Sequence, residues 1–345
     1  MTQSLNNVAA CDPPCVRQAV ARLWPGATWS AEPLDGGMTN RNFKVEVQIT
    51  DREQRTVVVQ EQLPDALAAR VGIRRENQVR AMAMVLDLGL APEVLGQWTE
   101  PRVLVSEFVE GALLSAVPDR VHATALVGQA LAKLHKHTQG VVMTGPISDP
   151  YSGTAWILNQ VKSEAPATAE TFAWTMDILA RIQAACGPYT PSLLHSDVSE
   201  GNVIILPDRA VLIDWEYVGA GDPYYDVGDF AEKGKLSSSE EEALLCAYDG
   251  VLVPTSLAMA RLYRFVSMLR EALWSVRAGT TGFTEFDYAN YARACLARMR
   301  EISQSSEFAD SLHLLENTNQ GEMNDLGRPI AASKSIGPRS PRALT

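Results

Sequence analysis

The stretch HSDVSEGNVIILPDRAVLIDWEY, which starts at His195, places carboxylates and an amide around two short apolar runs. Asp197, Asn202 and Asp214 are the residues best suited to chemistry. Carboxylate and amide oxygens are the hard ligands that Mg²⁺ prefers. A carboxylate left off the metal can accept a proton from a substrate hydroxyl. The residue types therefore predict a magnesium site beside a general base.

The two apolar runs predict the element that brings these groups together. VIIL (203–206) and AVLI (210–213) are joined by Pro-Asp-Arg, a spacing typical of a β-hairpin. Residues before and after the strands of a hairpin lie at one edge, so we expect Asp197, Asn202 and Asp214 to converge there. A base Asp, an Asn five residues later and a second Asp after the hairpin fit the phosphoryl-transfer template. The alternative is a polar loop around a surface hairpin.

These residues carry a resemblance to a known family. DVSEGN (197–202) is similar to the D-x-x-E-G-N of choline kinases, and DWEY (214–217) resembles their D-[FW]-E-Y. Choline and ethanolamine kinases belong to the aminoglycoside phosphotransferase superfamily, which is related to protein kinases. The resemblance implies ATP and Mg²⁺ as cofactors, Asp197 as catalytic base, and Asn202 and Asp214 as metal ligands. It gives His195 the part of bracing the loop, with a direct catalytic part as the alternative.

The resemblance covers about residues 30–303 and implies an α+β, two-lobed protein-kinase-like fold with a small β-rich N-lobe and a larger, mostly helical C-lobe. The apolar patterns agree with this division. They predict strands at 43–49, 55–63 and 103–109, and helices at 16–24, 76–90, 119–138, 154–164, 168–186, 238–249, 256–278 and 286–303. We expect a flexible leader over 1–15, an N-lobe over 16–110, a C-lobe over 111–304 and a disordered tail over 305–345.

The N-lobe carries candidate nucleotide-binding residues. Gly36 and Gly37 let a turn approach phosphates, and Thr39 and Asn40 can donate hydrogen bonds. The resemblance places this segment in the loop that covers the phosphates. It also places the hinge that meets adenine at SEFV (106–109), with Glu107 and Val109 as the contacting residues.

One part of the family pattern is missing. The family has a Lys or Arg on an N-lobe strand, paired with a Glu on the next helix, but TVVVQEQLPD offers no cation. The family spacing puts Gln62 in this position with Gln78 as its partner. A second register pairs Gln60 with Glu76. A Gln62–Gln78 pair can hydrogen-bond, but it brings no charge to the phosphates.

The acceptor site is predicted from aromatic residues near the end of the predicted C-lobe. Tyr217, Trp274 and Tyr291 match positions of the choline kinase aromatic box, and aromatic faces attract ammonium groups by about 0.5 to 2 kcal/mol. Glu271 stands where choline kinases have a second Trp, which favours a less methylated amine. The plain alternative for these aromatics is core packing. The candidate acceptor is thus a small cationic alcohol such as choline or ethanolamine. An aminoglycoside or thiamine is the alternative acceptor. A catalytically weak binding protein is the alternative function.

Bulk properties exclude other classes. The 345 residues carry a net charge of −11, which argues against nucleic-acid binding. No run approaches the roughly 18 apolar residues of a membrane span, and the first residues lack the pattern of a signal peptide. The five cysteines are read as reduced thiols, which indicates a cytoplasmic protein. The sequence leaves a homodimer open.

Overall fold

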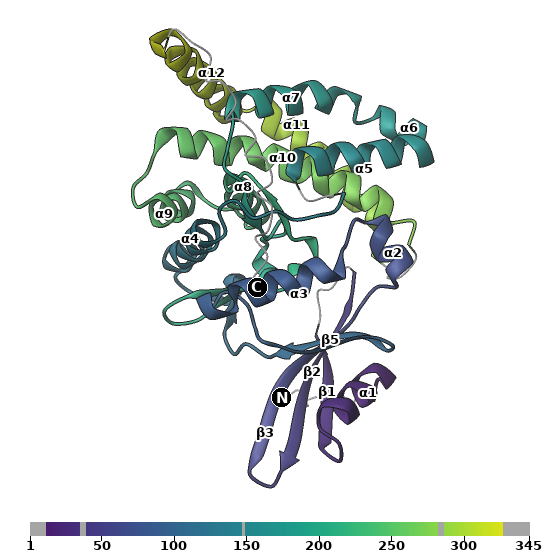
Figure 1. Cartoon of the computed structure of the whole chain (residues 1–345). Coiled ribbons are helices and arrows are strands. Elements are labelled where there is room, and N and C mark those ends of the chain that lie inside the picture. The colour runs from purple at the N-terminus through teal and green to yellow at the C-terminus, as the bar shows by residue number, and fades with distance from the viewer. Residues whose placement is uncertain (1–11, 35–38, 147–148, 282–285, 327–345) are drawn as a thin grey trace, which may run out of the picture.

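The structure is a computed structural model that describes residues 12–34, 39–146, 149–281 and 286–326, with side chains described to residue 319. A β-rich N-terminal lobe and a larger helical lobe meet along helix α3, Arg75–Val85, as Figure 1 shows. Gly36 and Gly37 lie outside the described residues.

The N-lobe is a five-stranded antiparallel sheet with the order β1-β2-β3-β5-β4. Alternating valines such as Val45, Val47, Val57 and Val59 point to one face and are buried with Val16 of α1. The strands are β1 Thr28–Leu34, β2 Arg41–Thr50, β3 Glu53–Glu61, β4 Val94–Thr99 and β5 Arg102–Glu107, and the helices are α1 Pro14–Leu23 and α2 Asp65–Arg70.

The C-lobe contains the predicted hairpin. β8, Val203–Ile205, pairs with β9, Ala210–Leu212, and β6, Ala112–Leu113, joins it as a third strand. A second pair, β7 (Ser192–Leu194) and β10 (Gly219–Gly221), brackets residues 195–217 on both sides. The hairpin prediction is therefore confirmed.

Helices surround these strands, and α10 is the central helix, which contacts α5, α7, α8, α11 and α12. Apolar residues of α10 such as Leu262, Phe265 and Leu269 are fully buried, so this helix forms the core of the lobe. The bounds are α4 Arg120–His137, α5 Pro150–Glu164, α6 Pro166–Glu170, α7 Ala173–Cys186, α8 Tyr224–Lys233, α9 Ser238–Asp249, α10 Pro254–Ala278, α11 Tyr288–Gln304 and α12 Ser306–Leu326.

Both predicted terminal boundaries need correction. The leader was expected over 1–15, but α1 begins at Pro14, and Cys15 is already buried in the N-lobe core. The tail was expected to be disordered from 305, but α12 spans Ser306–Leu326 and packs against α10. The physical reason is a short apolar stripe at helical spacing, which buries Phe308, Leu312 and Leu315.

Candidate active site

Asp226 at the start of α8 holds the loop that carries the predicted base. Its carboxylate accepts hydrogen bonds from the backbone N–H groups of His195, at 2.8 Å, and Ser196, at 2.9 Å. His135 of α4 lies 3.2 Å from the same carboxylate. Ser196 itself has φ 64°, in the left-handed region that ordinary residues avoid. The Asp226 contacts keep the strained loop in one conformation.

His195 braces the same loop rather than facing the cleft. Its imidazole is fully buried, and Nε2 donates to the carbonyl oxygen of Ile213 at 2.9 Å. The ring packs edge-to-face on Trp215. Burial lowers the pKa of His195, so the ring is neutral at physiological pH. These contacts agree with the bracing role predicted for His195, and its direct catalytic role stays a prediction.

Asp197 lies at the end of this loop with a donor on each carboxylate oxygen. Lys233 Nζ lies 2.6 Å from Oδ1, and Asn202 Nδ2 donates to Oδ2 at 2.9 Å. Burial alone would raise the pKa of Asp197, but the charge and hydrogen bond of Lys233 outweigh burial and lower it. Each carboxylate oxygen still has a lone pair for a hydroxyl donor. The group is therefore a charged acceptor with capacity left.

Asp214 and Asn202 are brought together by the hairpin, as predicted. The N–H of Ile213 donates to the carbonyl of Asn202 at 2.9 Å, so Asp214 follows directly beside the Asn. Asp214 has φ 61°, again left-handed. Burial, followed by the charges of Glu216 and Asp197, raises the pKa of Asp214 well above its usual value. A partly buried cluster of acids with this backbone strain is typical of a cation site.

The small donor set at Asp214 and Asn202 suits Mg²⁺, which does not need a complete shell of protein ligands. Mg²⁺ usually takes one or two carboxylates and fills its shell with waters and substrate phosphates. Among the described residues, no group of three or more His, Cys, Asp and Glu side chains is arranged to hold a metal alone. Asn202 uses its amide nitrogen on Asp197, which leaves its side-chain oxygen outside that contact.

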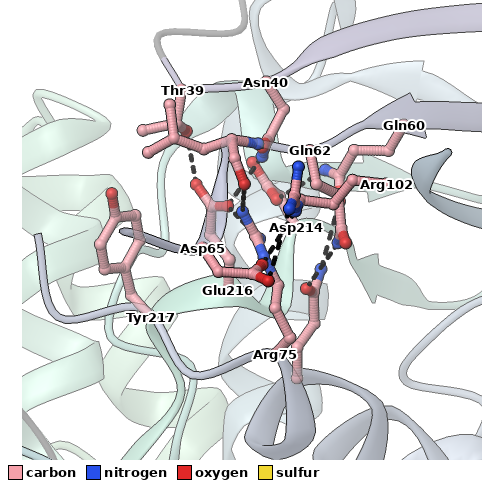
Figure 2. A network of polar contacts seen from close by, with 12 residues as sticks. Thr39, Asn40, Gln60, Gln62, Asp65, Arg75, Arg102, Asp214, Glu216 and Tyr217 are labelled. Atoms are coloured by element: carbon pink, nitrogen blue, oxygen red, sulfur yellow. Dashed lines mark hydrogen bonds and ion pairs between the residues drawn. The ribbon is translucent and has the colours of Figure 1, made fainter. Parts of the chain in front are cut away.

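Glu216 joins the two lobes instead of facing a metal. Thr39 donates to one of its oxygens, and Asn40 donates to the other at 2.7 Å. Arg75 of α3 adds an ion pair, with Nη1 3.2 Å from Oε2, and the Glu216 side chain is only 1% exposed. Figure 2 shows these residues converging from the sheet, α3 and the turn after the hairpin. Thr39 and Asn40, predicted for phosphates, thus point their donors at Glu216.

A cluster of three glutamines occupies the position of the missing cation. Gln62 Nε2 lies 3.1 Å from Gln78 Oε1, as the first predicted register requires. Gln60 accepts from both and donates to Asp214 at 3.1 Å, as Figure 2 shows in part. The second register is wrong, because Glu76 is 68% exposed and pairs with Arg74.

The predicted hinge follows β5, where the sheet passes into the C-lobe. The N–H of Glu107 donates to the carbonyl of Glu93 at 3.0 Å, and the N–H of Phe108 donates to Thr56 at 3.1 Å. These bonds anchor the segment to the sheet at both residues. Val109 is half-buried directly after them. The roles of Glu107 and Val109 toward adenine remain predictions.

The predicted acceptor residues meet in pairs near Asp197. Trp274 Nε1 donates to the hydroxyl of Tyr217 at 2.7 Å, and their rings pack edge-to-face. Tyr291 donates to Glu271 at 3.1 Å. Asp197, Tyr217, Glu271 and Trp274 all line one cavity of about 20 Å³. Space of this size holds about one water, so an acceptor binds here only when the wall rearranges.

Sequence reasoning missed three cations around this site. Lys233 contacts Asp197, Asp229 at 3.2 Å and Glu271 at 2.9 Å. Arg75 lies on Glu216, and Arg270 lines the small cavity. All three cations lie on helices, where Lys and Arg side chains usually face solvent. Only their contacts in the folded protein distinguish them from ordinary surface residues. The sequence held one signal for them: the strand at 55–63 lacks the expected cation, so other cations were to be sought.

A larger cavity, about 1,100 Å³, lies elsewhere between α2, α3 and the turn that joins β4 and β5. Gln62 and Arg75 line it, but Asp197 and Asp214 do not. Its other arginines include Arg102, which pairs with Asp65 at 2.9 Å. The acid cluster, not this larger hollow, therefore defines the candidate active site.

No single helix in the part of the chain that the structure describes is long and apolar enough to cross a membrane. Helices α9 and α10 together have that length and composition, but they are bent by 118° relative to each other.

Comparisons with known proteins agree with this geometry. The model of the phosphotransferase enzyme family matches residues 30–264 of the chain. LicA of Haemophilus influenzae is 29% identical over 102 residues, which is 28% of this chain and 38% of LicA. The chain therefore matches well under half the length of this curated relative.

Solved structures of low identity share the fold. A choline/ethanolamine kinase family protein from Mesorhizobium loti superposes with a TM-score of 0.68 at 23% identity, over 87% of this chain and 99% of that one. An aminoglycoside 2′-phosphotransferase solved with GDP gives 0.60 at 14% identity, over 85% and 98%. The predicted α+β, two-lobed kinase-like fold is confirmed, as is the resemblance stated from the sequence.

Proposed function

Because this chain belongs to the phosphotransferase enzyme family, we propose that it transfers the γ-phosphoryl group of ATP to the hydroxyl of a small amino alcohol. Choline and ethanolamine are the candidate acceptors. The observation that carries the proposal is the convergence of Asp197, Asn202 and Asp214 around one hairpin.

The protein's own part in the reaction is positioning and charge. Asp197, held ionised by Lys233, accepts a hydrogen bond from the acceptor hydroxyl and aims its oxygen at the γ-phosphorus. The new O–P bond forms as the bond to the β-phosphate oxygen breaks, and ADP leaves. The hydroxyl proton passes to Asp197 late in this step. Asn202 fixes the second carboxylate oxygen during the transfer.

Asn202 and Asp214 are the residues that would hold Mg²⁺. A bound Mg²⁺ supplies neutralisation of phosphate charge. The backbone of Gly36, Gly37, Thr39 and Asn40 is proposed to cover the phosphates, because the side chains of Thr39 and Asn40 donate to Glu216. The backbone at Glu107 and Val109 is proposed to meet adenine. Gln62, in place of the family's cation, gives the nucleotide a polar but uncharged neighbour.

On the acceptor side, Tyr217 and Trp274 offer aromatic surface next to Asp197, and Glu271 offers a carboxylate. Tyr291 orients Glu271 through its hydroxyl. A small ammonium fits this chemistry. An aminoglycoside and thiamine remain the alternative acceptors, and a weakly active binding protein remains the alternative function.

The proposed location is the cytoplasm. Cys15, Cys186, Cys246 and Cys295 are unpaired in the part of the chain that the structure describes, as expected in a reducing compartment.

The test is transfer of ³²P from labelled ATP to a panel of choline, ethanolamine, thiamine and an aminoglycoside. Asp197→Asn is the control variant, because general-base help accounts for roughly 10²–10⁴-fold in rate. We expect labelled amino alcohol with wild type and at least a hundredfold less with the variant. Equal rates for both proteins would reject the assignment of Asp197.

A further inference from the structure

Arg270 is a buried cation without a matched anion. It lies on α10, its residue is 5% exposed, and it borders the same small cavity as Asp197. Its Nη1 reaches only the hydroxyl of Tyr225, at 3.5 Å. Its Nη2 is buried and has no hydrogen-bond partner among the described residues. Burying a charge is unfavourable unless it is paired, so an unpaired guanidinium indicates a missing partner.

Asp229 and Glu271 stabilise the charge of Arg270 electrostatically, but among the described residues no carboxylate forms an ion pair with its guanidinium. Glu271, the next residue on α10, is engaged by Lys233 at 2.9 Å and by Tyr291 at 3.1 Å. Asp197 is engaged by Lys233 and Asn202. The fork of a guanidinium matches a planar carboxylate with two parallel hydrogen bonds. The unpaired Nη2 therefore favours an anionic group of the substrate.

The positions of Arg270, Glu271 and Trp274 on α10 indicate which other chemical groups such a substrate has. Arg270 and Trp274 are one turn apart on one face of the helix, with Glu271 beside them, and Asp197 borders the cavity with them. An acceptor held at all of these points needs a hydroxyl for Asp197, an ammonium for Glu271 and the aromatic rings, and an anion for Arg270.

We propose that the acceptor of this enzyme is an amino alcohol that also bears a carboxylate, and that Arg270 binds this carboxylate. The inference rests on the proposed phosphotransferase function and narrows its substrate class. Choline and ethanolamine satisfy Asp197 and Glu271 but leave Arg270 unpaired. A hydroxylated amino acid satisfies all three side chains at once.

Two matched pairs of acceptors test the proposal, since the members of each differ by one carboxylate: ethanolamine with L-serine, and 3-aminopropanol with L-homoserine. We expect wild-type kcat/KM to be about tenfold to a hundredfold higher for at least one carboxylated member, the range of a charge-assisted hydrogen bond. In Arg270→Gln the ratio of kcat/KM between the carboxylated acceptor and its partner without the carboxylate should fall toward one, mainly because KM for the carboxylated acceptor rises. Arg270→Lys, which keeps the charge, should retain part of it.

Arg277→Gln is the matched control. Arg277 is a buried arginine two turns further along α10, but it contacts Trp156 and Glu164 instead of the cavity. The control should keep the wild-type ratio. Thermal melts of all variants establish that they are folded, and Arg270→Lys decides the matter if Arg270→Gln does not fold.

The contrary outcomes are distinct. Transfer to ethanolamine or choline without a preference for carboxylated acceptors would overturn the inference and leave the proposed function standing. An equal fall in kcat for both members of a pair in Arg270→Gln would assign Arg270 to the transferred phosphoryl group and also overturn it. Transfer to none of the alcohols by a protein that binds nucleotide would reject the proposed function and the inference together.

Discussion

Lys233 determines the charge balance around Asp197, the proposed base. Its ammonium contacts three carboxylates, those of Asp197, Asp229 and Glu271, and its side chain is only 8% exposed. These acids raise the pKa of Lys233 well above its usual value although burial alone would lower it. Burial raises the pKa of Asp229 to about 6, with Lys233 acting against that rise. Removing one cation thus leaves several buried acids without compensation.

Lys233→Met should therefore destabilise the protein by about 3 kcal/mol or more, the usual effect of breaking a buried ion pair. Urea unfolding measures this change. Lys235→Met is the control, because Lys235 is exposed two residues further on and should shift stability by less than about 0.5 kcal/mol. Adding Glu271→Gln to Lys233→Met should recover part of the loss. Equal stability of the two Lys variants would show that Lys233 is not needed for charge balance.

At the scale of elements, the contact between β3 and α3 carries the chain's main departure from its family's pattern. Gln62 and Gln78 replace a charged pair by amide hydrogen bonds, and Gln60 extends the cluster to Asp214. The amides satisfy one another, so the sheet and α3 remain joined. The nucleotide phosphates gain no positive charge from this cluster.

Gln62→Arg combined with Gln78→Glu should restore the charged pair and raise kcat/KM for ATP. A charge-assisted hydrogen bond contributes about 1.5 to 3 kcal/mol, which corresponds to roughly tenfold to a hundredfold. Gln62→Arg alone should gain less, because its guanidinium faces a neutral Gln78. A double-mutant cycle measures the coupling. Strictly additive effects would argue against a phosphate-facing role for this position.

Helix α12 forms in a segment whose amino-acid composition wrongly predicts disorder. The segment after Ser305 is rich in Ser, Asn and Glu, which predicts disorder, yet Phe308, Leu312 and Leu315 lie four and three residues apart and share one helical face. Three apolar side chains suffice because α10 offers a preformed apolar surface. A sequence pattern alone does not reveal that surface.

Leu312→Ala should lower the free energy of unfolding by about 2 kcal/mol, the lower end for a buried leucine, since α12 packs on one side only. Leu314→Ala on the exposed face is the control and should have little effect. Chemical denaturation measures both. If the two variants unfold alike, α12 does not contribute its buried face to the folded protein.

The other elements differ in how far the sequence predicts them. The helix at 238–249 has the predicted bounds, because a capping box from Ser237 and Glu240 marks its start and Gly250 its end. Strand β1 was missed because Pro33 interrupts its pattern, which an edge strand tolerates. The three-residue strands β7 and β10 are too short for any periodicity. Site residues named by a spaced motif were predictable, but Arg270 and Lys233, defined by packing alone, were not.

At the scale of the whole molecule, two carboxylates join the lobes across the site. Asp214 accepts from Gln60 of β3, and Glu216 holds Thr39 and Asn40, just before β2, and Arg75 of α3, as Figure 2 shows. Asn40 also accepts from the N–H of Leu63, which ties the same point to the segment after β3. The relative position of Thr39, Asn40 and the acid cluster therefore depends on this contact.

Glu216→Gln should loosen the arrangement of the lobes without changing the shape of the side chain. The amide keeps some hydrogen bonds but removes the charge that pairs with Arg75, whose side chain is only 14% exposed. We expect a lower melting temperature, a larger radius of gyration by small-angle X-ray scattering, and a higher KM for ATP. Glu241→Gln is the matched control, because Glu241 is also buried, at 5% exposed, and pairs with Arg264 at 2.8 Å inside the C-lobe. A Glu216→Gln protein as compact and as stable as the Glu241→Gln protein would show that other contacts hold the lobes together.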